Sequence, residues 1–593
     1  MTLTLLDWII VAVSFGASLV TGIVFTRQGG RSVQDFFLSG RQLPWWLAGT
    51  SMVATTFAAD TPLAVAGIVA RQGIAGNWIW WSAAAGSMMT VFLFARLWRR
   101  AGIVTDVELA ELRYHGRPAA ALRVFRALYL GLPINCVIMG WVNLAMAKVL
   151  SVMLGWTELS AVLVSLALTG IYSAMAGLWG VVVTDFLQFG FAMGGTIALA
   201  WFVVRAPAVG GLDALVAAVP APTLAFVPDL SIAATAAASL SAGAFLTYLG
   251  VQWWASWYPG QEPGGGGYVA QRMMSAKSER DALAATLWFT VAHYCLRPWP
   301  WILVGLATLV LYPDAADREA AYVLAMRDHL GPGWRGLLLG AFFAAYMSTI
   351  SSQLNWGTSY LVNDVYRRFV RGDATESHYV WVSRLTTLAL MALSALVTFY
   401  LESIRQAWEF VLESGAGIGL VLMLRWYWWR VSAWSEVTAM IAAAVGFALV
   451  RGLTDWMFPL SMVAVVAWTT AWWLLVTAIT APEPAATLEA FYTRVRPPGP
   501  GWAPVARRLG HAPAPLRPLL GAWLAGTALV YALLFGVGHL LLHSAAAALP
   551  YAAVAVAAAW VVARALPRGS DGIVAGGTGA TSEPRAPSPE SRP

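Results

Sequence analysis

Long apolar runs separated by short polar loops recur from one end of the 593-residue chain to the other. A helical run of about 20 residues crosses roughly 30 Å of hydrocarbon at about 1.5 Å per residue. Sliding windows of hydrophobicity give about fifteen such spans. They begin near residues 5, 45, 77, 124, 157, 180, 231, 285, 336, 379, 407, 434, 457, 518 and 546. This repetition predicts an all-α polytopic membrane protein embedded in a lipid bilayer.

Composition agrees with a membrane bundle and excludes an ordinary soluble domain. Hydrophobic residues make up 59% and charged residues 11% of the chain, whereas soluble domains are about 25% charged. The first run, Leu5 to Phe25, carries Asp7 near its start and lacks a basic leading segment and a small-residue cleavage site. We therefore interpret it as a retained span rather than a signal peptide. Cys136 and Cys295 lie in apolar runs and are expected to be packing residues, not a disulfide or a metal site.

Basic residues gather in alternate loops. The formal charge of +7 is explained by orientation in the membrane, so we set nucleic-acid binding aside. By the positive-inside rule the basic loops are cytoplasmic, which predicts an outside N-terminus and an inside C-terminus in a cell membrane, expected to be a bacterial cytoplasmic membrane. These loops contain Arg27, Arg31 and Arg41; Arg99, Arg100, Arg113 and Arg117; Arg272, Lys277 and Arg280; Arg367, Arg368 and Arg371; Arg425 and Arg430; and Arg494, Arg496, Arg507 and Arg508.

The C-terminal part of the chain changes character. A Pro-rich linker from Pro482 to Pro518 contains the segment Arg496-Pro-Pro-Gly-Pro-Gly-Trp, and it separates the last two spans, which we interpret as an appendage. The segment after Arg564 is rich in Gly, Ser and Pro without apolar periodicity, which predicts disorder. No soluble catalytic module is recognisable, so we expect function to lie in the earlier spans.

The second span contains a helix-breaking signal at membrane depth. It reads Ser51-Met-Val-Ala-Thr-Thr-Phe-Ala-Ala-Asp-Thr-Pro-Leu. Pro62 lacks a backbone N–H and disfavours helix at Thr61, so carbonyl groups about one turn upstream lose their partners. In lipid, such freed carbonyls are tolerated where they are buried or line a cavity, and they could bind a hard cation. The alternative is a simple proline kink stabilised by threonine hydroxyls.

The ninth span supplies a second set of oxygens. It reads Ala344-Ala-Tyr-Met-Ser-Thr-Ile-Ser-Ser-Gln-Leu-Asn, which is unusually polar for a membrane segment. Ser348 and Thr349 can both turn their hydroxyls toward one ion beside the helix, and the carbonyl of Ala345 becomes available if Ser348 distorts the helix. Oxygen-only coordination suits Na⁺. Alternatively, these hydroxyls bond to their own helix or to a neighbouring one.

Four segments, in order along the chain, carry a family resemblance. They are Phe36-Phe-Leu-Ser-Gly-Arg-Gln-Leu-Pro-Trp-Trp leading into Ala-Thr-Thr-Phe; Gly177-Leu-Trp-Gly-Val-Val-Val-Thr-Asp-Phe-Leu-Gln; Gln271-Arg-Met-Met-Ser-Ala-Lys; and Ala345-x-x-Ser-Thr with Leu354-Asn355. Together they resemble the sodium:solute symporter family, to which the sodium-coupled glucose and proline transporters belong. The resemblance covers roughly residues 5 to 480.

The resemblance implies a leucine-transporter-type fold with two inverted repeats of five helices and extra terminal helices. It implies a Na⁺ site formed by the carbonyls of Ala54, Phe57 and Ala345 with the hydroxyls of Ser348 and Thr349. Asp185 falls at the family's acidic position, where sodium is thought to leave; a carboxylate favoured by a helix N-terminus is the alternative. The expected parts are residues 1–44, an extra N-terminal span and cytoplasmic loop; 45–206 and 207–432, the two repeats; 433–481, additional spans; 482–517, a cytoplasmic linker; 518–566, C-terminal spans; and 567–593, a disordered tail.

Charged side chains at membrane depth are candidates for the substrate site because they are costly to bury in lipid. Asp60 lies at the break of the second span, Arg297 lies between Leu296 and Pro298, and Glu413 precedes Ser414-Gly-Ala-Gly. Asp60 and Arg297 could instead form a structural ion pair. Lys148, in the outer part of the fourth span, is better explained as reaching to the outer interface. Thr56 and Trp254 complete the candidate set.

The seventh span reads Gln252-Trp-Trp-Ala-Ser-Trp-Tyr-Pro-Gly-Gln-Glu-Pro-Gly-Gly-Gly-Gly-Tyr and matches no family pattern. Pro259 and the glycine run predict an unwound segment from Pro259 to Gly267, which could act as a gate. Trp253, Trp254, Trp257 and Tyr258 could stack on a ligand, although an interfacial aromatic belt explains them better. The glycines are not a phosphate loop, because no P-loop Lys-Ser/Thr follows them.

These features favour a sodium-coupled symporter of a small organic solute. A buried Arg297 slightly favours a carboxylate-bearing solute over a sugar. The alternatives are proton coupling through Asp60 or Asp185, an intramembrane enzyme, and a transporter-like sensor. An enzyme would need a convergent cluster of acids, bases or metal ligands, and His293 stands alone in its predicted helix. No obligate protein partner is implied.

Overall fold

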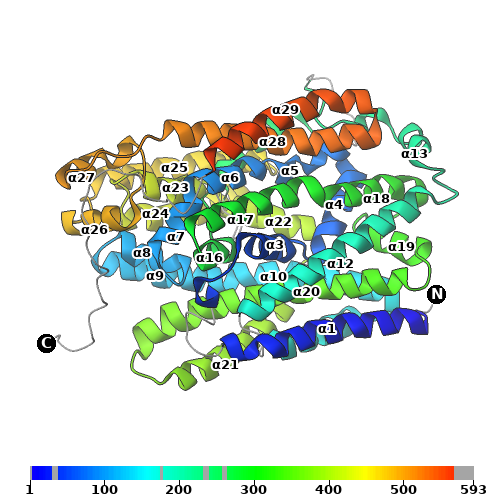
Figure 1. Cartoon of the computed structure of the whole chain (residues 1–593), viewed down its shortest axis with the longest axis horizontal. Helices are drawn as coiled ribbons and strands as arrows, with labels where there is room; N and C mark the ends of the chain where they lie inside the picture. Colours follow the sequence, from blue (N-terminus) through cyan, green and yellow to red (C-terminus); the bar gives the residue numbers. More distant parts are fainter. Residues whose placement is uncertain (1–2, 30–37, 174–177, 231–239, 257–263, 567–593) are drawn as a thin grey trace.

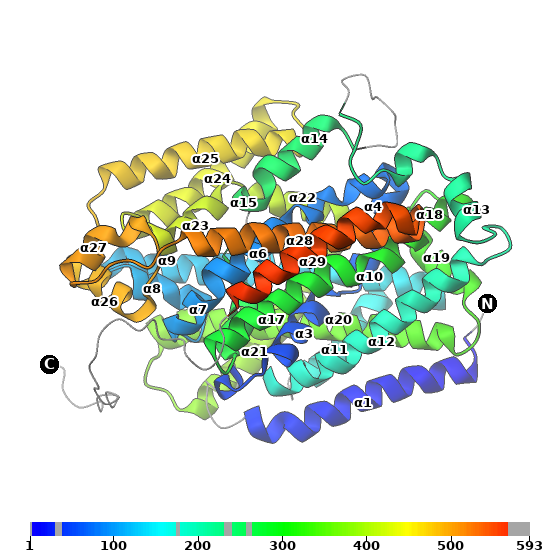
Figure 2. The same cartoon turned by 45° about the horizontal axis from the view of Figure 1, so that its top comes forward.

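The computed structural model describes residues 3–29, 38–173, 178–230, 240–256 and 264–566, and within them the chain is helical, without a β-strand. The helices run roughly along one common direction (Figure 1). The hairpin of α28 (Arg517–Leu542) and α29 (Ala545–Ala565) lies along one flank of the bundle, and α1 (Leu5–Gly29) lies along the opposite flank (Figures 1 and 2). The all-α prediction is confirmed.

Helices stand at the positions of the predicted spans. Ten helical runs in the described residues are long and apolar enough to cross a membrane, and two bent pairs raise this number to twelve. The other predicted spans correspond to α1, α11 and the interrupted run from α14 to α16. Between α1 and the α28–α29 hairpin, five uninterrupted spans consist of one helix each: α11 (Glu158–Ser173), α12 (Leu178–Val204), α21 (Glu376–Thr398), α24 (Ala433–Leu453) and α25 (Leu460–Ile479). Four others contain more than one helical segment: Ile74–Ala101 (including α6, Ala83–Met89, and α7, Ala95–Ala101), Gly116–Leu154 (α9, Gly116–Tyr129, to α10, Asn135–Leu154), Glu279–Leu311 (α17, Glu279–Val291, to α18, Pro298–Leu311) and Trp334–Val370 (α20, Trp334–Ser359, and η9, Tyr360–Val370).

The second span is broken, as its sequence predicts. Helix α3 (Trp45–Thr56) and helix α4 (Asp60–Gln72) meet at an angle of 58°. The break precedes Pro62, which lies in the first turn of α4, where a missing N–H costs nothing because first-turn N–H groups have no helical partner. The carbonyl of Thr56 accepts a hydrogen bond from the hydroxyl of Thr61 at 3.2 Å. A proline and a threonine together therefore terminate α3 inside the bundle.

Two further spans are interrupted. The seventh span runs through α14 (Ala242–Thr247), η7 (Tyr248–Gln252) and α15 (Trp253–Ala255), and helix resumes only at α16 (Gly267–Ser275). Of the predicted unwound segment, Gly264 to Gly266 are non-helical, whereas 257–263 lie outside the described residues. Helices α22 (Ile404–Ser414) and α23 (Ile418–Tyr427) bend by 52°, and the N–H of Gly417 between them donates to the carbonyl of Ala255 at 2.9 Å. The two interruptions thus support each other.

The ninth span differs from its expectation. Helix α20 continues without a break through Ser348 and Thr349 to Ser359, so the condition stated above for the Ala345 carbonyl, a distortion at Ser348, is not met. The hydroxyl of Ser348 is bonded to a neighbouring helix and does not compete for its own backbone. A carbonyl within an intact helix still has a second lone pair, so the oxygen of Ala345 stays available as an acceptor.

The Pro-rich linker is packed, not loose. It contains α26 (Ala485–Val495), η10 (Pro500–Trp502) and α27 (Ala503–Arg508), and Phe491 and Trp502 are completely buried. The hairpin that follows is no appendage either: Tyr531 donates to the carbonyl of Trp81 at 3.0 Å, and Trp299 donates to the carbonyl of Leu534 at 3.1 Å. Aromatic side chains join this hairpin to the core, and a windowed hydropathy reading does not detect such contacts. Residues 567–593, the predicted tail, lie outside the described residues.

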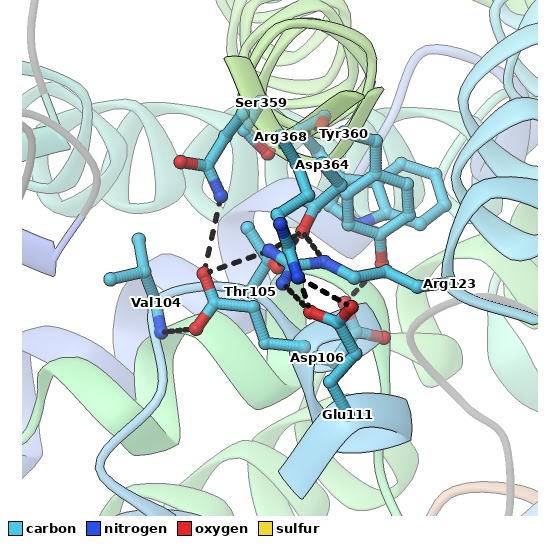
Figure 3. A network of polar contacts seen from close by, with 12 residues as sticks. Val104, Thr105, Asp106, Glu111, Arg123, Ser359, Tyr360, Asp364 and Arg368 are labelled. Atoms are coloured by element: carbon cyan, nitrogen blue, oxygen red, sulfur yellow. Dashed lines mark hydrogen bonds and ion pairs between the residues drawn. The ribbon is translucent and has the colours of Figure 1, made fainter. Parts of the chain in front are cut away.

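A network of polar contacts joins segments that are distant in sequence (Figure 3). Arg123 of α9 donates to Asp364 of η9 at 2.5 and 2.8 Å and to Glu111 of α8 (Leu109–Arg113) at 2.5 Å. Tyr360 donates to Asp106, which also accepts the backbone N–H of Gly267 at 3.1 Å. Asp364 is fully buried. The network therefore joins α20 to α9 and to the start of α16.

We expect Arg123→Ala to destabilise the protein strongly, because it leaves the buried carboxylate of Asp364 without its cation. Removing one partner of a buried pair costs about 3–5 kcal/mol. The midpoint of thermal unfolding in detergent should fall. Arg367→Ala is the matched control, since Arg367 pairs with Glu376 on the exposed surface, where a pair contributes about 0–1 kcal/mol. Equal midpoints for the two variants would contradict this assignment.

Candidate functional site

The end of α3 and the middle of α20 meet inside the bundle. The hydroxyl of Thr349 donates to the carbonyl of Thr55 at 3.0 Å, in the last turn of α3. The hydroxyls of Thr55 and Ser352 lie 3.5 Å apart. Ser348, Thr349 and Thr55 are at most 3% exposed. Backbone oxygens at the end of a broken helix therefore lie beside side-chain oxygens of an intact helix that is distant in sequence.

A buried carboxylate adjoins this junction. Asp185 of α12 accepts hydrogen bonds from Ser348 at 2.5 Å and from Ser51 at 2.6 Å. Arg272 of α16 donates to Ser51 and Ser352, and its guanidinium lies 4.0 Å from the Asp185 carboxylate. Asp185 lies two turns inside α12, so its position does not match the helix N-terminal carboxylate considered above. Four helices thus converge on one polar cluster.

A cavity opens beside the break. About 100 Å³ of it is open to the centres of water molecules, and one water needs roughly 10–15 Å³ on this measure, so a small organic solute fits. Thr56, Asp60, Arg297 and Thr349 line it. Its walls also carry four tryptophans and one tyrosine, namely Trp80, Trp141, Trp253, Trp408 and Tyr268. The cavity wall therefore combines several aromatic side chains with two charged groups.

Arg297 closes the end of α3. Its guanidinium donates to the Thr56 hydroxyl at 3.0 Å and to the Val53 carbonyl at 3.4 Å, and it lies 2.6 Å from Nδ1 of His293. A guanidinium only donates, so Nδ1 of His293 accepts. A cation is favoured at a helix C-terminus, where the helix dipole is negative. His293 is thus a partner of Arg297 in the cavity wall, not an isolated packing residue.

The sequence around Arg297 explains its position. Pro298 and Pro300 lack the N–H groups that an α-helix needs, and the preceding turn, η8 (Ala292–Leu296), is a wider π-helical turn. The N–H of Arg297 bonds to the carbonyl of Ala292, five residues back. A π-helical turn shifts the side chains that follow it relative to a regular helix. This shift directs His293 and Arg297 to the cavity.

Asp60 occupies the opposite side of the break, in the first turn of α4. It is 3% exposed, and its Oδ1 has no hydrogen-bond partner among the described residues. The indole of Trp408 lies within hydrogen-bonding reach of the carboxylate. The positive end of the α4 dipole stabilises a negative charge here. The break thus provides two helix ends of opposite polarity, each next to a side chain of the opposite charge.

Two predicted candidates lie elsewhere. Trp254 is not among the residues that line the cavity, and its indole donates to the Gly250 carbonyl at 2.7 Å; its neighbour Trp253 lines the cavity instead. Glu413, fully buried at the end of α22, accepts a hydrogen bond from Arg451 at 2.6 Å and is also absent from the cavity wall. Thr56, Asp60 and Arg297 are brought together.

Comparisons with known proteins give the family of the chain. The model of the sodium:solute symporter family matches residues 36–446. The chain belongs to the sodium:solute symporter family. Sequence relatives include a sodium/glucose cotransporter of Vibrio parahaemolyticus, 25% identical over 444 residues (71% of this chain, 79% of the relative), and sodium/glucose cotransporter 1 of Oryctolagus cuniculus, 24% identical over 492 residues (75% and 71%).

The fold is that of a solved relative. The structure of a substrate-bound, outward-open Na⁺-coupled sialic acid symporter superposes with a TM-score of 0.65 at 19% identity, covering 81% of this chain and 99% of that one. The symporter therefore has the leucine-transporter-type fold, and its coupling ion is Na⁺. Family membership also selects transport over the enzyme alternative.

Sequence reasoning missed part of the symporter's cavity wall. Trp80, Trp141 and Trp408 lie in apolar spans, where 32 tryptophans in the chain hide any local signal. Gln252 and Gln353 are different: each is a polar residue within an apolar span, and this feature marked the serines and threonines of α20. The same criterion applied to glutamine would have found both.

The structure places Lys148 in an ion pair. Its Nζ lies 2.7 Å from Glu319 and 2.9 Å from Asp317, both of the segment before α19 (Ala320–His329). Glu319, 1% exposed, also lies 3.4 Å from Arg71 of α4. A lysine that finds buried carboxylates gains more than one that extends into interfacial water. This pairing links α10, α4 and the α18–α19 connection.

Lys148→Met should lower the midpoint of thermal unfolding of the symporter in detergent, because methionine keeps the apolar stem and leaves the buried Glu319 carboxylate with one weaker partner. A loss of about 3–5 kcal/mol is expected for a broken buried pair. Lys277→Met, at an exposed position, is the matched control and should change stability by under about 0.5 kcal/mol. If both variants unfold like the unmodified protein, Glu319 does not depend on Lys148.

Proposed function

We propose that the symporter binds Na⁺ at the α3–α20 junction and that inward sodium flow drives uptake of a small organic solute through the neighbouring cavity. The ligands would be the carbonyl oxygens of Ala54, Phe57 and Ala345 and the hydroxyl oxygens of Ser348 and Thr349. The contact of Thr349 with the last turn of α3 is the observation that carries this proposal. Hard cations prefer such oxygen sets.

The hydrogen-bond directions support this ligand set. The hydroxyl of Thr349 donates its hydrogen to the Thr55 carbonyl, and the hydroxyl of Ser348 donates its hydrogen to Asp185. Both hydroxyl oxygens therefore keep lone pairs for a cation. Asp185 offers the next oxygens along the path, so we propose that sodium leaves past this carboxylate. Sodium would compete there with Arg272, whose guanidinium is 4.0 Å away.

The solute is proposed to carry a carboxylate rather than to be a sugar. Arg297 lines the cavity and is fixed by Thr56, His293 and the end of α3. A fixed guanidinium costs little side-chain entropy when it receives an anion, and its planar fork matches a carboxylate. The relatives named above are described by glucose and sialic acid, and sialic acid is the acidic one.

Transport would proceed by alternating access. We propose that residues 45–206 and 207–432 form the two repeats, which rock around a site near the midplane. The end of the bundle that carries the Arg123 network and the basic loops would face the cytoplasm, with the N-terminus outside and the C-terminus inside, in a bacterial cytoplasmic membrane. Residues 433–566 would then flank the moving core.

Radioactive sodium binding to the purified protein tests the ion site. The unmodified protein should bind sodium saturably, with displacement by NaCl and not by KCl. The double variant Ser348→Ala with Thr349→Ala should lose at least about tenfold in affinity, since each lost ligand is worth more than about 1 kcal/mol.

The control uses the same chemical change on the same helix. Thr358→Ala with Ser359→Ala removes an adjacent threonine and serine that bond to Thr387 and to the Trp356 carbonyl, away from the junction. This variant should keep its sodium affinity. Undiminished sodium binding in the Ser348/Thr349 variant, with the protein folded as judged by its unfolding midpoint, would refute the proposed ligand set.

A further inference from the structure

The buried polar atoms of the cavity wall that lack a hydrogen-bond partner are all of one kind. Among the residues that line it, three buried side-chain polar atoms have no hydrogen-bond partner within the described part of the chain, namely Oδ1 of Asp60, Oε1 of Gln252 and Oε1 of Gln353. All three are acceptors. The Gln252 amide is oriented, because its Nε2 donates to the Ile79 carbonyl at 2.5 Å. Buried acceptors without donors are costly, so the wall is complementary to a ligand that brings N–H or O–H groups.

The charge distribution narrows the class of donor. Asp60 lines the cavity as a carboxylate at the dipole-positive start of α4, and Arg297, held in place by Thr56, His293 and the end of α3, lines the same cavity. A hydroxyl and an ammonium both donate to a carboxylate, but only an ammonium also neutralises its charge in a site that excludes water. Asp60 therefore favours a cationic donor over a polyol.

The aromatic wall supports the same choice. Trp80, Trp141, Trp253 and Trp408 line the cavity, and Trp408 lies beside Asp60. The faces of indole rings attract cations, and tryptophan is the strongest of the aromatic side chains in this respect. Desolvation in a buried site increases this attraction. A cavity that contains a carboxylate and several indoles is thus suited to an amine.

We propose that the transported solute carries a protonated amine, that Asp60 and the surrounding acceptor oxygens receive it, and that the solute is therefore a zwitterionic amino acid-like molecule. This inference rests on the proposed function, in which Arg297 receives the carboxylate of the same solute. The two charged walls of the cavity then bind the two charged ends. Because the charges of Asp60 and Arg297 sum to zero, the empty cavity carries no net charge.

Matched solutes test the amine directly. The probes are four sets in which the carboxylate is constant and the amine is replaced by hydrogen or hydroxyl: alanine, propionate and lactate; beta-alanine, propionate and beta-hydroxypropionate; gamma-aminobutyrate, butyrate and gamma-hydroxybutyrate; and phenylalanine, phenylpropionate and phenyllactate. Glucose serves as the polyol. Binding is measured as the rise in the unfolding midpoint with concentration, in NaCl and in KCl. At least one amine should bind at least about tenfold more tightly in NaCl than both of its analogues.

Variants assign the preference to Asp60. Asp60→Asn keeps the size and removes the charge, and it should reduce the amine preference at least about tenfold. Asp213→Asn makes the same change at an exposed position of α13 (Leu212–Ala218) and should leave the preference unchanged. If Asp60→Asn does not fold, the comparison of solutes on the unmodified protein still decides the proposal.

The outcomes separate this inference from symport itself. Binding that depends on sodium but is equal for amine and hydroxyl analogues, or strongest for glucose, overturns the amine assignment and leaves sodium coupling intact. Amine-selective binding that is equal in NaCl and KCl supports the assignment and contradicts coupling. An Asp60→Asn protein that keeps its amine selectivity overturns the role of Asp60, whether or not it also loses its sodium dependence. If none of the amines binds to the unmodified protein, the amine assignment itself is overturned.

Discussion

The structure depends on one constraint: a helix that ends inside a membrane leaves carbonyl groups that must find partners there. In this chain α3 ends at Thr56, and the partners come from far along the sequence. Thr349 donates to the carbonyl of Thr55, and Arg297 donates to the carbonyl of Val53. The same carbonyl-rich end thus determines which helices gather around it. The proposed cation site and the neighbouring cavity both follow from this one interruption.

The interruption also accounts for charges that would otherwise be too costly. A broken helix presents the negative end of one dipole and the positive end of another close together, and this chain places Arg297 at the first and Asp60 at the second. Each charge is stabilised by the helix end beside it. Lys148 and Glu319, in contrast, stabilise each other in an ion pair.

Much of the architecture could be predicted from the sequence, because membrane helices have a strong one-dimensional signal. Apolar length placed the spans, and Pro62 placed the break of the second span within a few residues. The same kind of signal does not show how the linker and the last hairpin pack, since Trp502 and Tyr531 make contacts that only the folded chain reveals. The partners of Lys148 are hidden for the same reason: these carboxylates lie about 170 residues away on the α18–α19 connection.

Only part of the candidate site could be predicted from the sequence. The criterion of a polar residue inside an apolar span identified Thr349 and Asp60, and the family resemblance supplied the set of proposed Na⁺ ligands. The residues of the cavity wall were harder to predict, because tryptophan in a membrane protein occurs in interfacial belts, in packed cores and in binding sites. Trp254 and Trp253 are adjacent in sequence, and only the turn that precedes them decides which one faces the cavity.

Hydrogen–deuterium exchange in NaCl and in KCl at equal ionic strength tests the central claim most directly. The account predicts that sodium slows amide exchange in peptides covering residues 53–61 and 345–352, while a peptide from α24 is unchanged. Both segments should respond at the same sodium concentration, because one ion binds to both. Exchange that is identical in the two salts, or that changes in only one of the two segments, would contradict a shared ion at the end of α3.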